Sequence, residues 1–372
     1  MSAPFGGSPS VRCLVTGATG HIGAHLTRYL RANGHEVWAM VRPSNHIERL
    51  DDVLRQRGER EWGVQVVVGD LSDEASIAHA VQEARPEVVF HLAWGGITAG
   101  EREDVSHLTR NIMGTLRLLQ SAGEVGCRAF VGLGSQAEYG PSGNHDILDT
   151  LAPLMRHGAA PGLEAYGLSK LCTGLLCHKM CELQGMNCVW LRLFATYGPN
   201  DDARHFIPTV IRHLLRGEKP ALTAGEQAWD YLYVEDAAEA MGLAGLKAVG
   251  ALPELRSVPR LRDANGSEAN GDADAMRETP PQRSGTFELG SGVARPVRGI
   301  AERIRDLIAP TLPLGLGEVP YREGQLMHLQ ANIAPLQAFV PWKPCTPLNE
   351  GLRRTIVWQQ RRQRLSTGRR TA

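Results

Sequence analysis

The 372-residue sequence has few of the features that mark several specialised classes of protein. Its seven cysteines are too sparse for a disulfide framework and are typical of a reducing compartment. No segment approaches the roughly 18 uninterrupted apolar residues of a membrane helix. The N-terminal segment, residues 1–10, lacks the basic start and the apolar core of a signal peptide. We therefore expect a cytoplasmic protein with no membrane-spanning segment.

The sequence also lacks an excess of charge of either sign. Lys and Arg together number 40, as do Asp and Glu, so no net field attracts nucleic acid or an anionic membrane. Arginines gather from residue 361 onward, but no aromatic residues alternate with them as a single-strand binding surface requires. We expect no nucleic-acid or membrane partner, and we interpret residues 359–372 as a solvated basic tail.

Short apolar runs alternate with amphipathic stretches along the first half of the chain. At roughly 150 residues per domain, the length suggests two domains. The β-α-β-α order predicts a Rossmann-type α/β fold, in which helices cover both faces of a doubly wound parallel sheet. Strands are predicted over residues 11–16, 35–41, 64–68, 88–92, 130–133, 188–192 and 286–289, and helices over 22–32, 75–83, 106–125 and 234–249.

Residues 251–285 differ from the rest of the chain in composition. The segment has no aromatic residue, and beyond Leu261 its only large apolar side chain is Met276. Such a segment buries too little surface to offset the entropy of ordering it. We predict a disordered insertion between the helix that ends near residue 249 and the strand at residue 286.

Three glycines open the first predicted helix directly after the first strand. Gly17 allows a tight turn, Gly20 lets the backbone approach a pyrophosphate, and Gly23 lets helix and strand pack closely. The exposed N–H groups and the helix dipole then favour phosphate. A glycine triplet alone is weak evidence, but the strand-turn-helix context favours dinucleotide binding.

The end of the second strand indicates which dinucleotide binds. NAD sites usually place an acid there for the ribose 2′-hydroxyl, and this chain has none before Glu48. Arg42 instead offers a planar fork for a 2′-phosphate, and Ser44 offers a further donor. These residues favour NADP(H), with NAD as the other possibility.

A tyrosine and a lysine lie four residues apart in the sequence Tyr166-Gly-Leu-Ser-Lys170. On a helix the two side chains share a face, and a nearby cation lowers the pKa of a phenol toward working pH. Ser135 follows the fifth strand, at the carboxyl edge where ligands bind in such sheets. The three residues together predict acid-base chemistry on a carbonyl or hydroxyl group.

These motifs belong to a longer series that spans nearly the whole chain. The series comprises Thr16–Gly23, Gly69–Leu71, His91–Ala93, Asn111–Thr115, Ser135, Tyr166 with Lys170, Arg192–Pro199, Trp229–Asp236, Leu289–Gly292, Arg322–Gln325 and Trp342–Pro344. It resembles the extended branch of the short-chain dehydrogenase/reductase superfamily, which contains nucleotide-sugar epimerases, dehydratases and reductases. By this resemblance Ser135, Tyr166 and Lys170 are catalytic. The expected cofactor-binding residues are Gly17, Thr19, Gly20, His21, Ile22, Gly23, Arg42, Ser44, Asp70, Leu71, Leu92, Ala93, Asn111, Tyr166 and Lys170.

The resemblance also implies a domain plan. Residues 11–195 and about 228–293 would form the NAD(P)-binding Rossmann domain. Residues of about 196–227 and 294–358 would form a smaller substrate lobe for the nucleotide sugar. Helices near 104–125 and 165–184 would pair across a homodimer.

Departures from the family pattern narrow the expected chemistry. Family members that eliminate water carry an acidic pair after the catalytic hydroxyl residue, where this chain has Gln136 and Ala137. Many members have Asn at the position of Ala195 and Arg at that of Trp229, both facing the sugar diphosphate. We therefore expect no dehydration, and take Ser135 and Gln136 together with Arg322 and, more weakly, Arg204 as the substrate residues.

A cluster of Cys172, Cys177, His178 and Cys181 could suggest a metal site. A structural zinc site needs four converging ligands, and no second Cys/His pair occurs at the required spacing. We interpret these residues as packing side chains and predict no metal site.

Three functions remain open on the sequence. The main interpretation is reduction of a 4-keto nucleotide sugar by NADPH, because Arg42 favours a released NADP(H). The alternative is an epimerase that holds NAD tightly, and a second alternative is a non-catalytic NADP-binding regulator.

Overall fold

The computed structural model describes residues 9–43, 47, 49–50, 63–96, 100–142, 163–252, 282–322 and 324–368. A seven-stranded sheet forms the body, and all of its strand pairs are parallel. The strand order is β10-β6-β5-β4-β1-β2-β3, with a crossover between β1 and β4, which confirms the doubly wound Rossmann topology. The strands are β1 (Arg12–Thr16), β2 (Glu36–Val41), β3 (Gln65–Val68), β4 (Val88–His91), β5 (Ala129–Ser135), β6 (Asn187–Leu193) and β10 (Gly285–Leu289).

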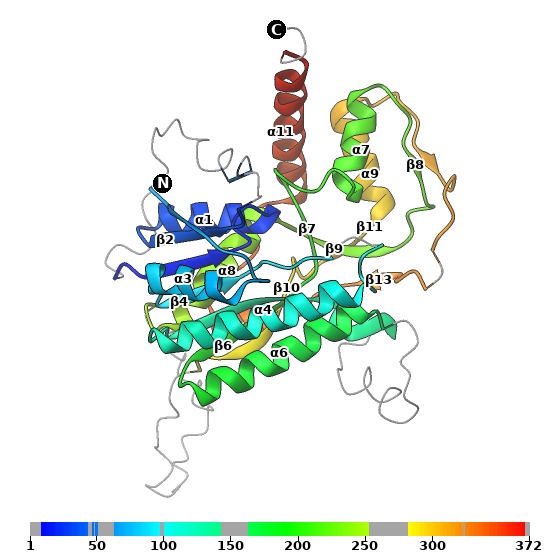
Figure 1. Cartoon of the computed structure of the whole chain (residues 1–372). Coiled ribbons are helices and arrows are strands. Elements are labelled where there is room, and N and C mark those ends of the chain that lie inside the picture. The colour runs from blue at the N-terminus through cyan, green and yellow to red at the C-terminus, as the bar shows by residue number, and fades with distance from the viewer. Residues whose placement is uncertain are drawn as a thin grey trace, which may run out of the picture.

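Helices cover both faces of this sheet (Figure 1). On one face α1 (His21–Ala32) packs against α8 (Val234–Ala248). On the other face lie α3 (Glu74–Ala84), α4 (Val105–Glu124) and α6 (Ala165–Leu183), and α4 runs beside α6. Each layer of helices closes an apolar core against the sheet, as the alternating sequence pattern predicts.

A smaller lobe stands at one end of the body. Its four strands are β7 (Ala195–Tyr197), β9 (Ala228–Tyr233), β11 (Ala294–Pro296) and β13 (His328–Leu329), and β9 pairs with the other three. Two short strands, β8 (Ala221–Leu222) and β12 (Gly315–Leu316), pair with each other. Along the chain β8 follows α7 (Phe206–Leu215), and β12 follows α9 (Val297–Ile308). Residues from about 228 were expected in the Rossmann domain. In the structure β9 pairs within the four-stranded sheet, and α8, which follows it, packs in the core of the body.

The end of the chain contributes to both parts. Helix α10 (Ala334–Phe339) packs on β10 of the body, where the rings of Phe339 and Phe287 stack with centroids 4.5 Å apart. Helix α11 (Leu348–Gly368) packs on α7 and α9 through Leu352 and Ile356 and then projects outward (Figure 1). Residues 359–368, expected as a tail, continue this helix because neither Gly nor Pro interrupts them before Gly368.

Two predictions fall on residues outside those described. They are the disordered insertion, of which residues 253–281 are not described, and the cofactor residue Ser44. Among the described residues, no helix is long and apolar enough to cross a membrane.

Candidate active site

The carboxyl ends of β1, β4 and β5 meet at one edge of the sheet, as parallel strands require. At this edge His91 links two threonines: its ring nitrogens lie 2.8 Å from Thr16 Oγ1 and 2.8 Å from Thr115 Oγ1. Burial, helped by the charge of Lys170, lowers the pKa of His91 to about 3. The imidazole is therefore a neutral connection between strands and helix, and not a base.

The turn after β1 has room only for glycine at two positions. Gly17 has a φ of +70°, and a Cβ there would lie 2.7 Å from the backbone nitrogen of Ala93. A Cβ on Gly23 would lie 2.1 Å from the carbonyl oxygen of Gly17. The bare backbone thus forms a cradle at the N-terminus of α1, which Gly20 caps.

His21 supplies a second sign that this cradle accepts a polar ligand. Both ring nitrogens of His21 are buried, and no described residue lies in hydrogen-bonding geometry with either of them. Burial lowers the pKa of His21, so the ring is neutral and carries one N–H donor. Buried polar groups are normally satisfied, and the pyrophosphate of a dinucleotide would offer acceptors at the first residue of α1. The residues present therefore fit a dinucleotide.

The other expected cofactor residues surround the cradle. Asp70 Oδ1 accepts hydrogen bonds from the backbone N–H and the hydroxyl of Ser72, and these bonds, with a smaller effect of Arg42, hold its pKa below the usual range. Arg42 itself is exposed at the end of β2. The amide of Asn111 exchanges two 2.9 Å hydrogen bonds with the backbone of Gly95 and so fixes the loop after β4.

Backbone proximity accounts for three further members of the set. Leu92 and Ala93 follow β4 and form the wall against which Gly17 packs. The carbonyl oxygen of Leu71 approaches α4 so closely that a Cβ on Gly114 would lie 2.6 Å from it. Of the remaining members, Thr19 and Ile22 belong to the turn and first residues of α1, and Ile22 is buried.

Ser135 and Tyr166 come together across 31 residues of sequence. The side chain of Ser135, at the end of β5, approaches the phenol of Tyr166, on the first turn of α6, closely enough to lower its pKa. Burial has the larger and opposite effect and raises the pKa of Tyr166, while the charge of Arg102 acts in the same direction as Ser135. The Arg102 guanidinium lies 5.0 Å from the centre of the Tyr166 ring. A tyrosine that lies beside a serine in this way can exchange a proton with a bound hydroxyl or carbonyl.

Lys170 lies one turn further along α6 and is buried. Its Nζ donates a 2.6 Å hydrogen bond to the carbonyl of Leu133 and lies 3.7 Å from the centre of the Trp94 ring. Burial lowers its pKa to about 7. The sequence predicts that Lys170 lowers the pKa of Tyr166, but the charge with that effect in the structure is that of Arg102, and burial outweighs it.

Glu138 is a fully buried carboxylate beside Ser135 that no sequence pattern marked as a site residue. It accepts a 2.8 Å hydrogen bond from the Ser135 backbone N–H and pairs with Arg192 at 2.7 Å. Glu138 comes directly after Gln136 and Ala137, the positions at which an acidic pair was sought. Trp94 and Arg102 were also missed, because only the folded chain brings them to Lys170 and Tyr166.

The expected substrate residues are less closely gathered. Gln136 follows Ser135 directly and is partly exposed. The guanidinium of Arg204 is exposed and pairs with Asp202 at 2.6 Å. Arg322 is exposed in the segment before β13. Trp229 belongs to an apolar cluster and donates a 3.0 Å hydrogen bond to the carbonyl of Leu326.

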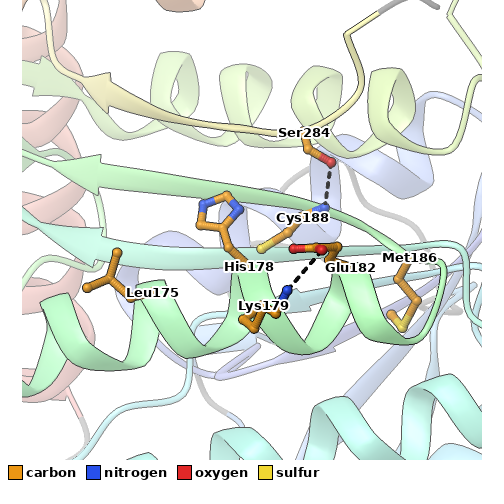
Figure 2. Close-up of a pocket in the computed structure, with 7 residues that line it drawn as sticks. All are labelled: Leu175, His178, Lys179, Glu182, Met186, Cys188 and Ser284. Atoms are coloured by element: carbon orange, nitrogen blue, oxygen red, sulfur yellow. Dashed lines mark hydrogen bonds and ion pairs between the residues drawn. The ribbon is translucent and has the colours of Figure 1, made fainter.

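The cysteines of α6 lie elsewhere. Cys177 and Cys181 are buried in the core between α6 and the sheet, as packing side chains are. Among the described residues no group of three or more His, Cys, Asp or Glu is placed to hold a metal. A surface pocket of about 510 Å³ lies nearby against α6 and β6, and it contains none of the expected site residues (Figure 2). Its lining residues are Leu175, His178, Lys179, Glu182, Met186, Cys188 and Ser284.

Comparisons with known proteins identify the family of the chain. A family model described as the NAD dependent epimerase/dehydratase family matches residues 13–252. UDP-glucuronate 4-epimerase 3 of Arabidopsis thaliana is 25% identical over 358 residues, which cover 93% of this chain and 75% of the relative. A 3-diazoavenalumate denitrifying reductase of Streptomyces is 30% identical over 232 residues, which cover 61% and 69% of the two chains. The solved UDP-glucose 4-epimerase of Thermus thermophilus in complex with NAD has a TM-score of 0.68 at 24% identity, with 93% of this chain and 98% of that chain covered.

Proposed function

Because the chain belongs to the NAD-dependent epimerase/dehydratase family of extended short-chain dehydrogenase/reductase enzymes, we propose that it is a 4-epimerase of a UDP-sugar. The observation that carries the proposal is the approach of the Ser135 side chain to the phenol of Tyr166, in a fold whose glycine cradle fits a dinucleotide. Relatives named as UDP-glucuronate 4-epimerases, matched over more than nine-tenths of this chain, support C4 as the reacting carbon. They favour epimerisation over the 4-keto reduction expected from the sequence.

The residues of the site have separate roles in this reaction. Tyr166 takes the proton from the 4-hydroxyl and later returns it, while Ser135 holds the same oxygen by a hydrogen bond. Lys170 Nζ donates to the Leu133 carbonyl in the structure, and in the proposed reaction it would donate to the dinucleotide ribose. NAD, when bound, supplies the hydride acceptor and donor for C4. Because Tyr166 both takes and returns the proton of the 4-hydroxyl, the reaction needs no further acid. The presence of Gln136 and Ala137 where other members have an acidic pair agrees with this.

We propose NAD as the cofactor of this reaction, since neighbouring structures of similar fold contain NAD. A second candidate function, net reduction with NADPH, is favoured by Arg42 at the end of β2 and by the reductase among the relatives. The two functions differ in whether the dinucleotide leaves after each turnover. An epimerase regenerates its cofactor on the enzyme, whereas a reductase consumes and releases it.

The experiment that separates them starts with the protein as purified. The bound dinucleotide is released with acid and identified, and the protein is then incubated without added cofactor with UDP-glucose, UDP-N-acetylglucosamine and UDP-glucuronate. Epimerisation predicts copurified NAD and formation of a C4 epimer detected by NMR. An empty site that turns over a 4-keto sugar only with NADPH would favour reduction instead.

We also propose a homodimer formed by α4 and α6. Their outer faces expose several large apolar side chains, which in a monomer would remain in water. These are Val105, Met113, Leu175, Leu176 and Leu183. The two helices already lie side by side, so a second copy would complete a four-helix bundle over them.

A positively charged group is still needed for the diphosphate of the substrate, and we propose Arg322 for this role. Its side chain is exposed in the segment before β13, which pairs with β9 of the lobe. Arg204 is a weaker candidate because its charge is already balanced by Asp202.

A further inference from the structure

Glu138 is a buried carboxylate that contacts the turn carrying the catalytic serine. It lies in the short helix η1 (Gln136–Ser142) that follows β5, and its exposed fraction is 0%. One oxygen accepts from the backbone N–H of Ser135 at 2.8 Å and from the indole N–H of Trp190 at 3.0 Å. The other oxygen accepts from Arg192 Nε at 2.7 Å. Charge-assisted bonds to three fixed donors hold the turn after β5 in one geometry.

The network continues from Arg192 into the rest of the molecule. Arg192 donates to the hydroxyl of Tyr139 at 3.1 Å, and that hydroxyl donates to Glu288 at 2.7 Å. The other oxygen of Glu288 accepts from the backbone N–H of Asn332, between β13 and α10. A buried polar network whose members are all satisfied is rigid, because a displaced member would lose its partner away from water. The position of Ser135 is therefore tied to strands β6 and β10 and to the chain that leaves the lobe.

We propose that Glu138 is a positioning residue for the reaction. Its carboxylate fixes the backbone of Ser135 and places a buried negative charge near Tyr166 and Lys170. The proposal rests on the proposed acid-base role of Ser135 and Tyr166. Glu138 is fully buried, and its carboxylate accepts from Ser135, Trp190 and Arg192, so we assign it an action through these neighbours.

The charge of Glu138 acts on both titrating groups in the same direction: it raises the pKa of Tyr166 and that of Lys170. Two further charges act on Tyr166. Arg102 lowers its pKa and Glu164 raises it, and these two form an ion pair that is partly exposed to solvent. Solvent and salt screen that pair more than they screen Glu138, which is enclosed by protein. Among the described residues, Lys170 on α6 itself also carries charge, as does Glu103, which accepts from the N–H of Ala165 at 3.0 Å.

The test is Glu138→Gln, which keeps a carbonyl acceptor for Ser135 and removes the charge. We expect kcat for the UDP-sugar that the parent protein epimerises to fall by roughly tenfold to a hundredfold, the equivalent of one charge-assisted hydrogen bond. KM should change little. The acid limb of the pH profile, which reports ionised Tyr166, should move to lower pH because loss of the Glu138 charge lowers the pKa of Tyr166. Glu36→Gln, which breaks an exposed ion pair with Arg12 at the far end of the sheet, should leave the profile unchanged.

A second variant separates positioning from stability. Glu138→Gln leaves Arg192 as a buried charge without its partner and can lower the melting temperature. The double variant Glu138→Gln/Arg192→Met removes both charges and should recover most of that loss while keeping the shifted pH profile. A parental profile in the double variant would reduce Glu138 to a structural residue and overturn the proposal.

A readout that needs no substrate keeps this test distinct from that of the proposed function. The near-ultraviolet absorbance of tyrosinate is titrated in the parent and in Glu138→Gln, with the matching Tyr166→Phe protein subtracted from each. The Tyr166 transition should occur at lower pH in Glu138→Gln. An unchanged transition contradicts the proposal, whereas a shifted transition in a protein that epimerises no UDP-sugar would contradict only the proposed function.

Discussion

At the scale of single residues, the account depends most on the hydroxyl of Tyr166. Tyr166→Phe removes that hydroxyl and leaves the ring beneath Arg102, so the fold and the dinucleotide site should persist. General acid-base catalysis contributes about 10²- to 10⁴-fold, and turnover should fall by that factor. Stopped assays of C4 epimer formation measure turnover, and quenching of protein fluorescence measures NAD binding. Tyr29→Phe, on the far half of α1, is the matched control and should retain parental turnover. Near-parental turnover in Tyr166→Phe would remove this residue from the mechanism.

Lys170 makes a prediction about stability and pH. Its pKa is about 7 in the folded protein and near 10.5 in an unfolded chain. Between these values the unfolded state binds more protons, so the Lys170 contribution makes the free energy of unfolding increase with pH. Lys170→Met lacks this contribution, and the difference between parent and variant should change by at most about 1.4 kcal/mol per pH unit. Urea unfolding of the cofactor-free proteins from pH 7 to pH 10 measures it. Parallel curves would contradict a lowered pKa for Lys170.

The residues of the site were predictable only where chemistry and sequence spacing coincide. The Tyr166–Lys170 spacing and the glycine triplet are local patterns that a helix or a turn converts directly into geometry. Glu138, Trp94 and Arg102 act through neighbours that are distant in sequence, and no local pattern marks them. The shift in the pKa of Tyr166 could not be predicted either, because burial by surrounding elements dominates it.

At the scale of elements, the turn between β1 and α1 gives a steric prediction. Gly23→Ala places a Cβ 2.1 Å from the Gly17 carbonyl, so helix and turn must separate. We expect a loss of about 1–3 kcal/mol in stability and markedly weaker NAD binding. Gly299→Ala, in α9 with nothing within 4 Å of the new Cβ, should instead stabilise the protein by about 0.5–1 kcal/mol. Thermal unfolding and NAD titration measure both. Unimpaired NAD binding by Gly23→Ala would show that the cradle does not hold the dinucleotide.

The loop after β2 gives a prediction about cofactor selection. Arg42 directly follows the last residue of β2, and it is the only cation among the described residues 41–43. Arg42→Ala should weaken NADP binding by roughly tenfold to a hundredfold if its fork contacts the 2′-phosphate, and should leave NAD affinity nearly unchanged. Calorimetric titration with both dinucleotides measures the two affinities. An equal loss of affinity for NAD and NADP would show that Arg42 contacts a portion of the dinucleotide that the two cofactors share.

The elements of the body were predictable because the central parallel strands are buried on both faces and read as apolar runs, while the edge strand β3 is an apolar run that leaves Val66 and Val68 exposed. Predicted and observed ends differ by one or two residues, as for β5, which continues to Ser135. Strand β9 was not predicted, and its residues fall within the range expected for the Rossmann domain although it pairs with β7, β11 and β13. Its partners β7, β11 and β13 are only two or three residues long, so sequence periodicity gives no sign of that sheet.

At the scale of the whole molecule, the exposed face of α4 and α6 predicts the assembly. Leu175→Arg places a charge on that face and should convert a dimer to monomers, because a buried unpaired charge is costly. Leu307→Arg, on an exposed position of α9 in the lobe, should leave the assembly intact. Sedimentation velocity measures the mass of each protein. A parental protein that sediments as a monomer, or a Leu175→Arg protein that stays dimeric, would contradict the proposed interface.

In the proposed reaction, one site removes hydrogen from C4 of a UDP-sugar and returns it to the opposite face. The most direct measurement uses UDP-glucuronate carrying deuterium at C4, incubated with the purified protein in ordinary water and followed by NMR. We expect the parent protein to form a C4 epimer that retains the deuterium at C4. Tyr166→Phe should form the same product about 10²- to 10⁴-fold more slowly. An epimer that has exchanged its C4 deuterium for solvent hydrogen, or equal rates in parent and Tyr166→Phe, would contradict it.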